Sequence, residues 1–377
     1  MYFLQRERAA LQAHLPGLDV ALAAQPLERL ESAPSPAIGA FRAAGGPGLL
    51  VPRALGGKGA SALEAVRVQR AVGSRCPSLA VATTMHHFSV AGLVRSAAPG
   101  GAEEQLLASV AADGLLLASG FAEGRAGQNI LKPHITAQLR GGKVVLNGSK
   151  MPCSLARSMD LLTASVLLAD EDGVERLAVA LVPAGSPGVE VRPFWRNPVL
   201  AGAESEQVVL TEVELDRGQV LLTEVTADAV PDDLNTAGFL WFELLLTAGY
   251  LGVASALVER VLTKPGGPPE DPAIHLVEVE AAMLAVEAVA RALDDEDQPW
   301  DDGLLVSALT ARYAAEDAIA RTTRGCLSAL GGMAFVGSGD GGYLAAAAGA
   351  LGFHPPARAR MAGPLREYLG GRPLRIG

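Results

Sequence analysis

A block of strand-type sequence lies between two long helical stretches, and this order limits the folds open to the chain. Residues 1 to about 115 are rich in alanine and are broken by proline and glycine, which is typical of short helices. From Leu115 onward apolar and polar residues alternate between turn residues, as in Lys143-Val-Val-Leu-Asn-Gly148. Apolar residues spaced three and four apart return after Pro231. We therefore predict three parts: a helical domain over 1–115, a β domain over 116–222 and a helical bundle over 223–377.

The composition of the 377 residues excludes two classes of protein. The chain has 31 basic and 41 acidic residues and a net charge of −10, so it lacks the basic surface of a nucleic-acid-binding protein. Hydrophobic residues make up 49% of the chain and charged residues only 19%, which excludes a disordered protein. This apolar balance indicates surface buried between domains or subunits, and we expect an oligomer.

The sequence also gives expectations about compartment and metal binding. We find no apolar run of the roughly 18 to 20 residues that a membrane span needs. The amino-terminal residues lack the apolar core of a signal peptide, so we expect a cytoplasmic protein with no membrane partner. Cys76, Cys153 and Cys326 are widely spaced and form no metal-type cluster. We expect them to be buried as small apolar residues, with no metal site.

Two stretches of the β block form a pair of motifs. They read Ala118-Ser-Gly-Phe-Ala-Glu-Gly-Arg-Ala-Gly-Gln-Asn129 and Leu146-Asn-Gly-Ser-Lys-Met-Pro-Cys-Ser-Leu155. Three more stretches accompany them: the glycine-rich segment 50–59, Ala248-Gly-Tyr-Leu-Gly252 and Leu330-Gly-Gly-Met-Ala-Phe335. Over nearly its whole length the chain therefore resembles the acyl-CoA dehydrogenase family. The resemblance implies an α+β fold with an N-terminal helical domain, a middle β-barrel-like domain and a C-terminal four-helix bundle. It also implies that the oligomer is a homodimer or homotetramer.

The resemblance also implies a bound flavin, usually FAD, which both β-block loops would contact. The positions expected to bind it are Phe121, Ala122, Gly127, Gln128, Cys153, Ser154, Gly331 and Gly332. Ala122 stands where the family has a threonine and Pro152 where it has a tryptophan, whereas Ser154 keeps a hydroxyl. The family's Arg-x-x-Phe-Gly motif for the FAD diphosphate is missing from residues 261–272, so FMN is an alternative cofactor. The alternative for both loops is ordinary solvent-facing turns, since Asn147-Gly148 is by itself a hairpin signal.

The family's catalytic base is missing from its usual place. Pro355 or Pro356 stands where most members of the family have a glutamate. Glu243 is the only charged residue in the apolar stretch 238–252, and we predict that it serves instead. Desolvation would raise the pKa of Glu243 toward the range of a general base. The alternative is that Glu243 pairs with an arginine.

Histidines are the other candidates for catalysis. His86 and His87 fall where the family's first domain approaches the substrate, and at most one of two adjacent side chains would face a pocket. We predict His87 as a catalytic residue, with a core or surface position as the alternative. His354 lies beside the missing base, and its alternative role is to rigidify its own loop.

These features predict a flavin-dependent dehydrogenase that acts on an acyl thioester in a biosynthetic pathway. The acyl group would be carried by coenzyme A or by an acyl carrier protein, and an electron acceptor would be a further partner. The first alternative is a flavin monooxygenase of the same fold, which takes reduced flavin from a partner reductase, uses oxygen and needs no base. The second alternative is a non-redox protein that has lost flavin binding.

Overall fold

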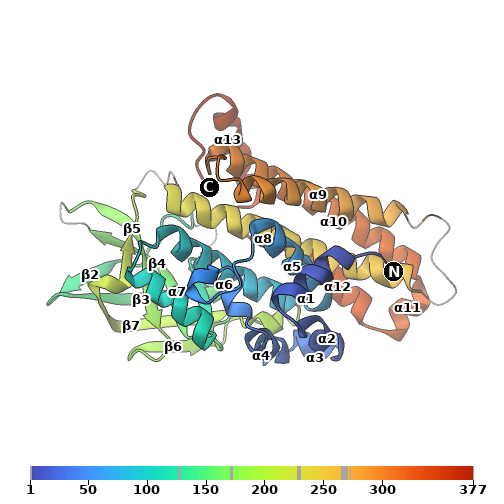
Figure 1. Ribbon diagram of the computed structural model, residues 1–377, viewed down its shortest axis with the longest axis horizontal. Coiled ribbons are helices and arrows are strands. Elements are labelled where there is room, and N and C mark those ends of the chain that lie inside the picture. The colour runs from blue at the N-terminus through green and yellow to red at the C-terminus, as the bar shows by residue number, and fades with distance from the viewer. Residues whose placement is uncertain are drawn as a thin grey trace.

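The computed structural model describes residues 2–125, 129–169, 173–226, 231–264, 271 and 273–376. Its described strands all lie between Leu117 and Leu222, and helices precede and follow them (Figure 1). The expected α+β order of a helical part, a β part and a second helical part is therefore confirmed.

The described residues before 115 form seven α-helices, several of them with clear start signals. They are α1 (Gln5–His14), α2 (Leu18–Ala23), α3 (Leu27–Glu31), α4 (Pro36–Ala43), α5 (Ala62–Arg75), α6 (Pro77–Ser96) and α7 (Ala102–Asp113). Ser61 and Glu64 start α5 with a capping box, in which each side chain accepts a hydrogen bond from the other residue's backbone N–H. Pro77 lies in the first turn of α6, where a missing N–H costs nothing.

The described strands form two four-stranded sheets. The strands of the first sheet are, in order, β1 (Leu117–Gly120), β4 (Leu161–Ala169), β5 (Glu175–Pro183) and β8 (Val220–Leu222). Those of the second sheet are, in order, β2 (Ala137–Arg140), β3 (Lys143–Cys153), β7 (Glu206–Asp216) and β6 (Val189–Arg192). The hairpin between β2 and β3 turns at Gly141 and Gly142, which both have positive φ. Asn147 and Gly148 lie inside β3, at a register shift against β7, so the hairpin expected at this pair is wrong.

The carboxyl-terminal helices are arranged around one central helix. They are α8 (Asp233–Leu262), α9 (Ala273–Asp294), α10 (Asp302–Leu330), α11 (Gly332–Gly337), α12 (Asp340–Ala348) and α13 (Arg358–Leu369). Helices from both helical parts pack on α8, namely α5 and α6 from the first and α9, α10 and α12 from the second. A Cβ atom on Gly252 would lie 2.2 Å from the Arg70 carbonyl oxygen, and a Cβ atom on Gly73 would lie 2.1 Å from the Gly249 carbonyl oxygen. Both distances are too short for a side chain. The glycines of the 248–252 motif therefore let α5 and α8 touch backbone to backbone.

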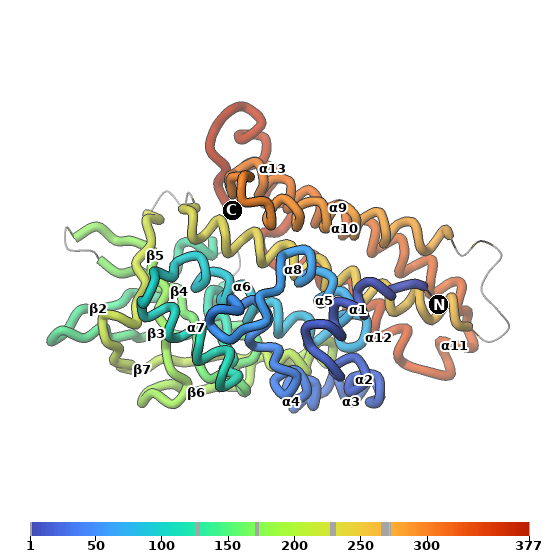
Figure 2. Tube along the Cα trace, viewed as in Figure 1, coloured from blue at the N-terminus to red at the C-terminus, as the bar shows by residue number. Residues whose placement is uncertain are grey.

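Helix α8 corrects the expectation about membrane-length apolar runs. It contains an 18-residue window with a mean hydropathy of 1.5, and by length and composition alone it could cross a membrane. All of that window is buried inside the protein, as in the core helix of a folded domain. Figure 2 shows α8 running from the sheets to the far end of the molecule, where α11 lies.

Candidate active site

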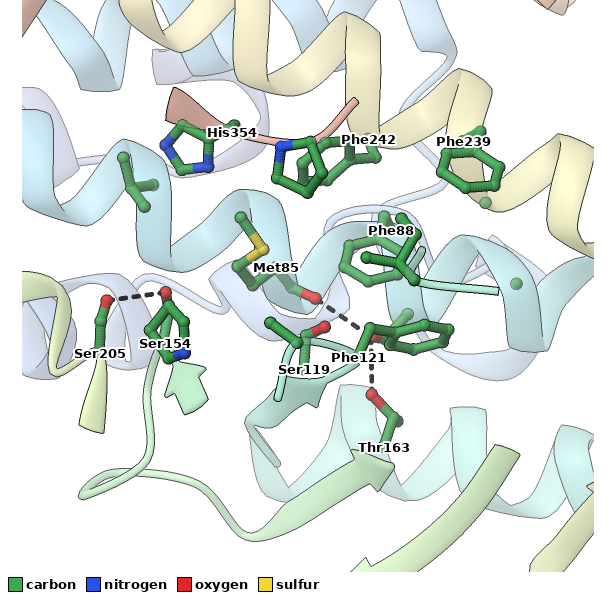
Figure 3. A pocket seen from close by; sticks show the side chains of 18 of the residues that line it. Met85, Phe88, Ser119, Phe121, Ser154, Thr163, Ser205, Phe239, Phe242 and His354 are labelled. Carbon is green, nitrogen blue, oxygen red and sulfur yellow. Dashed lines mark hydrogen bonds between the residues drawn. The ribbon is translucent and has the colours of Figure 1, made fainter. Parts of the chain in front are cut away.

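A cavity of about 510 Å³ lies where the three parts of the chain meet (Figure 3). It is enclosed by α6, by the ends of β1 and β3, by the first turns of α8 and by the segment 350–360. Five of the nine phenylalanines of the chain line it: Phe88, Phe121, Phe239, Phe242 and Phe353. A cavity of this size and apolar character suits an organic ligand with few polar groups.

Three of these rings form a continuous aromatic surface across the cavity. The Phe88 ring centroid lies 5.8 Å from that of Phe121 and 5.7 Å from that of Phe242, and both contacts are edge to face. Phe88 comes from α6, Phe121 follows β1 and Phe242 comes from α8, so the surface joins all three parts of the chain.

The sheet side of the cavity supplies hydroxyl groups. The Oγ atoms of Ser154 and Ser205 lie 3.0 Å apart, and both residues line the cavity. Ser89 Oγ of α6 and Thr163 Oγ1 of β4 form a second hydroxyl pair at 3.1 Å, and both residues also line the cavity. The cavity therefore has an apolar wall and a hydroxyl-bearing edge. Among the described residues, no group of three or more His, Cys, Asp or Glu side chains could hold a metal ion.

The two loops of the sequence motifs lie side by side and are tied together. Met151 N donates to the Ala122 carbonyl oxygen at 2.9 Å, and Lys150 Nζ donates to Glu123 Oε1 at 2.8 Å. Burial alone would raise the pKa of Glu123, but the Lys150 ammonium and backbone N–H groups, including that of His134, hold it below its usual value. Lys150 and Glu123 therefore fix one cavity-lining loop to the neighbouring strand.

The residues predicted to bind flavin are divided among several places. Phe121, Ala122 and Ser154 line the cavity. Cys153 is buried in β3, where burial raises the pKa of its thiol to about 12, and it is not part of the cavity lining. Gly127 and Gln128 lie outside the described residues. Gly331 and Gly332 lie at the start of α11, at the end of the molecule away from the sheets (Figure 1).

Glu243, the predicted base, lies behind the cavity wall and does not line it. Its side chain is fully buried and accepts two hydrogen bonds from Arg312 Nη1, at 2.8 and 3.0 Å. Phe242, one residue earlier on α8, faces the cavity. The structure therefore agrees with the alternative in which Glu243 pairs with an arginine, and it does not bring Glu243 to the cavity as a base would require.

The adjacent histidines of α6 are both buried away from the cavity. His86 Nε2 lies 2.9 Å from the Pro47 carbonyl oxygen, and His86 Nδ1 accepts from Leu117 N at 3.1 Å, so its ring holds two backbone segments together. His87 packs against Phe41, and neither of its ring nitrogens has a hydrogen-bond partner among the described residues. His87 is not in the cavity lining, so the structure does not bring this predicted catalytic residue to the site.

His354 is the histidine that lines the cavity. Its Nε2 lies 2.8 Å from the hydroxyl of Tyr250, which leaves Nδ1 as the ring nitrogen that can meet a ligand. Burial, and then the nearby Arg312 charge, lower the pKa of His354 to about 3. The ring is therefore neutral near pH 7 and serves as a hydrogen-bonding group.

Several cavity residues were not singled out from the sequence. Trp195 and Ser205 lie on the irregular segment between β6 and β7, and Phe88 and Phe239 lie on α6 and α8. Aromatic residues make up only 5% of the chain, so the positions of its few phenylalanines are the sequence signal that could have indicated an aromatic cavity wall. No such signal marked Ser205, because an isolated serine after a loop has no distinctive pattern.

Comparisons with known proteins fit this arrangement. No family model matches the chain. Isobutylamine N-hydroxylase of Streptomyces viridifaciens is 47% identical over 365 residues, which cover 96% of each chain. Cyclohex-1-ene-1-carbonyl-CoA dehydrogenase of Syntrophus aciditrophicus is 23% identical over 301 residues, which cover 76% of this chain and 70% of that one. The FMN-bound dibenzothiophene monooxygenase TdsC of Paenibacillus sp. A11-2 has a TM-score of 0.82 at 21% identity and matches 99% of both chains. The acyl-CoA dehydrogenase resemblance is thereby confirmed at the level of the fold.

Proposed function

The chain belongs to the family of isobutylamine N-hydroxylase, and on this premise we propose that it is a flavin-dependent monooxygenase that hydroxylates the nitrogen of a primary amine. Of the functions expected from the sequence, this is the monooxygenase alternative. The thioester dehydrogenase has weaker support, because the dehydrogenase relative is less than half as identical to this chain as the N-hydroxylase.

The proposed reaction consumes a reduced flavin, oxygen and an amine. One oxygen atom enters the N–H bond to give a hydroxylamine and the other leaves as water, while the two electrons come from the flavin, which becomes oxidised. A partner reductase would supply the reduced flavin. The reaction removes no α-proton from a thioester, so it requires no carboxylate base.

The cavity fits a flavin ring. Its apolar wall would cover a planar ring system, and the Ser154 and Ser205 hydroxyls together with the backbone beside Phe121 and Ala122 would meet the polar ring edge. We propose FMN as the cofactor, in line with the FMN-bound structure of the same fold. FAD, the cofactor first expected, is the alternative.

The observation that carries the proposal is the state of the acid and base groups at the cavity. Glu243, the residue that a thioester dehydrogenase would need as its base, is bound to Arg312 behind the wall. The imidazole that does line the cavity, His354, is neutral and is held by Tyr250. A neutral imidazole in an apolar cavity can orient an amine by a hydrogen bond at Nδ1, whereas its low pKa makes it a poor acceptor of an α-proton.

The experiment that tests the function compares two reactions of the purified protein. In the first, FMNH₂ and ¹⁸O₂ are supplied with a series of primary amines, and we expect a hydroxylamine that carries one ¹⁸O atom by mass spectrometry. In the second, oxidised flavin is mixed anaerobically with acyl thioesters of coenzyme A and of a carrier protein, and we expect no bleaching. Bleaching by a thioester, together with no hydroxylamine from any amine, would overturn the proposal in favour of the dehydrogenase.

We also propose that the protein works as a homo-oligomer. Met333, Phe335 and Val336 of α11 are between 72% and 84% exposed, and adjacent exposed apolar residues of this kind are typical of contacts between subunits. A second copy of the chain is the occupant that the apolar composition favours. Light scattering after gel filtration is expected to give at least twice the monomer mass of 38.8 kDa, and a monomer mass would contradict this proposal.

A further inference from the structure

Arg312 of α10 is one of the two largest fully buried side chains among the described residues, and its contacts converge on the cavity wall. Its Nη2 donates to the carbonyl oxygens of His354 at 2.6 Å and Leu351 at 3.2 Å, and its Nη1 donates to that of Pro355 at 3.2 Å. Glu243 of α8 accepts from the same Nη1 and neutralises the charge. One guanidinium therefore binds three carbonyl groups of the segment that carries His354.

Two tyrosines complete this attachment. The Tyr313 hydroxyl donates to the Pro356 carbonyl oxygen at 3.1 Å, and the Tyr250 hydroxyl lies 2.8 Å from His354 Nε2. Residues 354–357 lie between η5 (Gly349–Phe353) and α13, outside helices and strands. Because no helix or sheet hydrogen bonds fix this stretch, side chains of α8 and α10 determine the position of His354.

Stability alone does not explain the ion pair. Two charges buried together lose so much hydration that an apolar pair of similar volume is often as stable. A guanidinium, however, has five N–H donors in a rigid plane, and it can bind several carbonyl groups in one geometry as no apolar side chain can. The pair therefore gives the segment a fixed position, which an apolar replacement would not give.

We propose that Arg312, neutralised by Glu243, is the positioning residue of the active site: it acts through the backbone of residues 351–355 to hold the His354 ring in the cavity, where the amine binds. This inference rests on the proposed function, which supplies the amine. Glu243 thereby has a role at the site without contacting the substrate.

The variant Arg312→Met removes all these hydrogen bonds, and Arg312→Lys keeps a charge that can reach fewer carbonyl groups. Arg70 of α5 offers a matched control, because it is also fully buried and is bound by Glu7 and Ser255, none of which lines the cavity. Arg70→Met is expected to lower the unfolding temperature as Arg312→Met does, without affecting the site. If Arg312→Met does not fold, Arg312→Lys carries the test.

The first readout uses the flavin-free protein and needs no activity. Side-chain ¹⁵N spectra of histidine-labelled protein are expected to show His354 as one neutral ring form, with the His86 ring as an internal reference. In Arg312→Met and Arg312→Lys we expect the His354 signals to move or broaden, with His86 unchanged. In Arg312→Met, which also removes the charge that helps to lower the pKa of His354, we expect the ring to titrate at a higher pH. Arg70→Met should leave both rings as they are. If the His354 signals in both Arg312 variants coincide with those of the unmodified protein, the positioning role is wrong.

The second readout is the yield of hydroxylamine per reduced flavin oxidised. A misplaced polar group at the reacting centre lowers the productive fraction by about tenfold to a hundredfold, so we expect this loss in Arg312→Met and a smaller one in Arg312→Lys. Arg70→Met should keep the yield. An unchanged yield in Arg312→Met would overturn the inference. If no amine is hydroxylated by the unmodified protein, the proposed function fails, and the histidine spectra still decide whether Arg312 positions His354.

Discussion

At the residue scale, the adjacent histidines of α6 show how differently two identical side chains can be used. The His86 ring has a partner at each nitrogen, namely the Pro47 carbonyl oxygen and the Leu117 N–H. The His87 ring is equally buried, but neither of its nitrogens has a hydrogen-bond partner among the described residues. The cost of desolvating a polar ring is therefore offset by hydrogen bonds in His86 and is not offset in His87.

Replacing each ring by leucine should separate these two cases. We expect His86→Leu to lower the free energy of unfolding by about 2 to 4 kcal/mol, because a carbonyl oxygen and an N–H are left buried without partners. We expect His87→Leu to leave it unchanged or to raise it by up to about 2 kcal/mol, because two unpartnered nitrogens are removed. Urea unfolding measures both values. A fully folded His87→Leu protein that has lost all oxygenation would instead support the catalytic role first predicted for His87.

Burial of the His86 ring contributes to the pH dependence of stability. Burial lowers the pKa of His86 to about 4, whereas the unfolded chain titrates near 6.5. Between these values the unfolded state binds more protons, so the stability present above pH 6.5 is lost as the pH falls toward 4, by about 3 kcal/mol. His86→Gln can keep one donor and one acceptor without titrating. Its stability should therefore fall less steeply than that of the unmodified protein in urea titrations between pH 7 and 4.5, and equal slopes would contradict this account.

At the element scale, some features could be predicted from the sequence and others could not. The order of helices and strands followed from hydrophobic periodicity, and the two motif loops do line a cavity, because each motif is local in the chain. The partner of Glu243 lies 69 residues away on another helix, and local patterns say nothing about such a contact. The hairpin expected at Asn147-Gly148 failed because β3 continues through these residues with a register shift, and the turn lies earlier.

The attachment of the loop after β1 can be tested on β3. Lys150 is fully buried and binds Glu123, so Lys150→Met removes the ammonium from a carboxylate that still accepts from the His134 and Ile135 N–H groups, and it should cost about 1 to 3 kcal/mol of unfolding free energy. Because Glu123 holds the cavity loop at 121–125, the affinity for FMN should also fall, which fluorescence titration measures. Lys143→Met on the same strand is the control, since its pair with Asp216 is exposed and should change neither value. Unchanged FMN affinity in Lys150→Met would show that this loop does not contribute to the flavin site.

The facing helices α6 and α8 each present a glycine to the cavity. A Cβ atom on Gly238 would have no heavy atom within 4 Å, and one on Gly92 would meet only Leu234 at 3.8 Å. Gly238→Leu should therefore fold and fill part of the cavity, and kcat/KM for bulky amines should fall by about tenfold or more relative to small ones. Gly39→Leu, at an open glycine of α4, is the control and should leave the preference unchanged. A uniform effect on all amines would mean that this part of the cavity does not hold the amine chain.

At the scale of the whole molecule, the cavity depends on all three parts of the chain. Its aromatic surface takes one ring each from α6, the loop after β1 and α8. Another part of its wall comes from the segment 350–360, which Arg312 attaches to α8 and α10. The long apolar helix α8 is central to both arrangements, which explains why a helix with the hydropathy of a membrane span is used inside this fold.

A ligand in such a cavity should stabilise the whole chain as one unit. FMN at about 100 times its dissociation constant contributes about 2.7 kcal/mol to the free energy of unfolding, provided that it binds only the folded state. For 377 residues, with an unfolding entropy of about 2.1 cal/mol/K per residue, this corresponds to a rise of about 3 °C in Tm. We expect calorimetry to show this shift in a single transition and a smaller shift with FAD at equal concentration. A larger shift with FAD would support the cofactor first expected, and no shift with either flavin would argue that this cavity does not bind flavin.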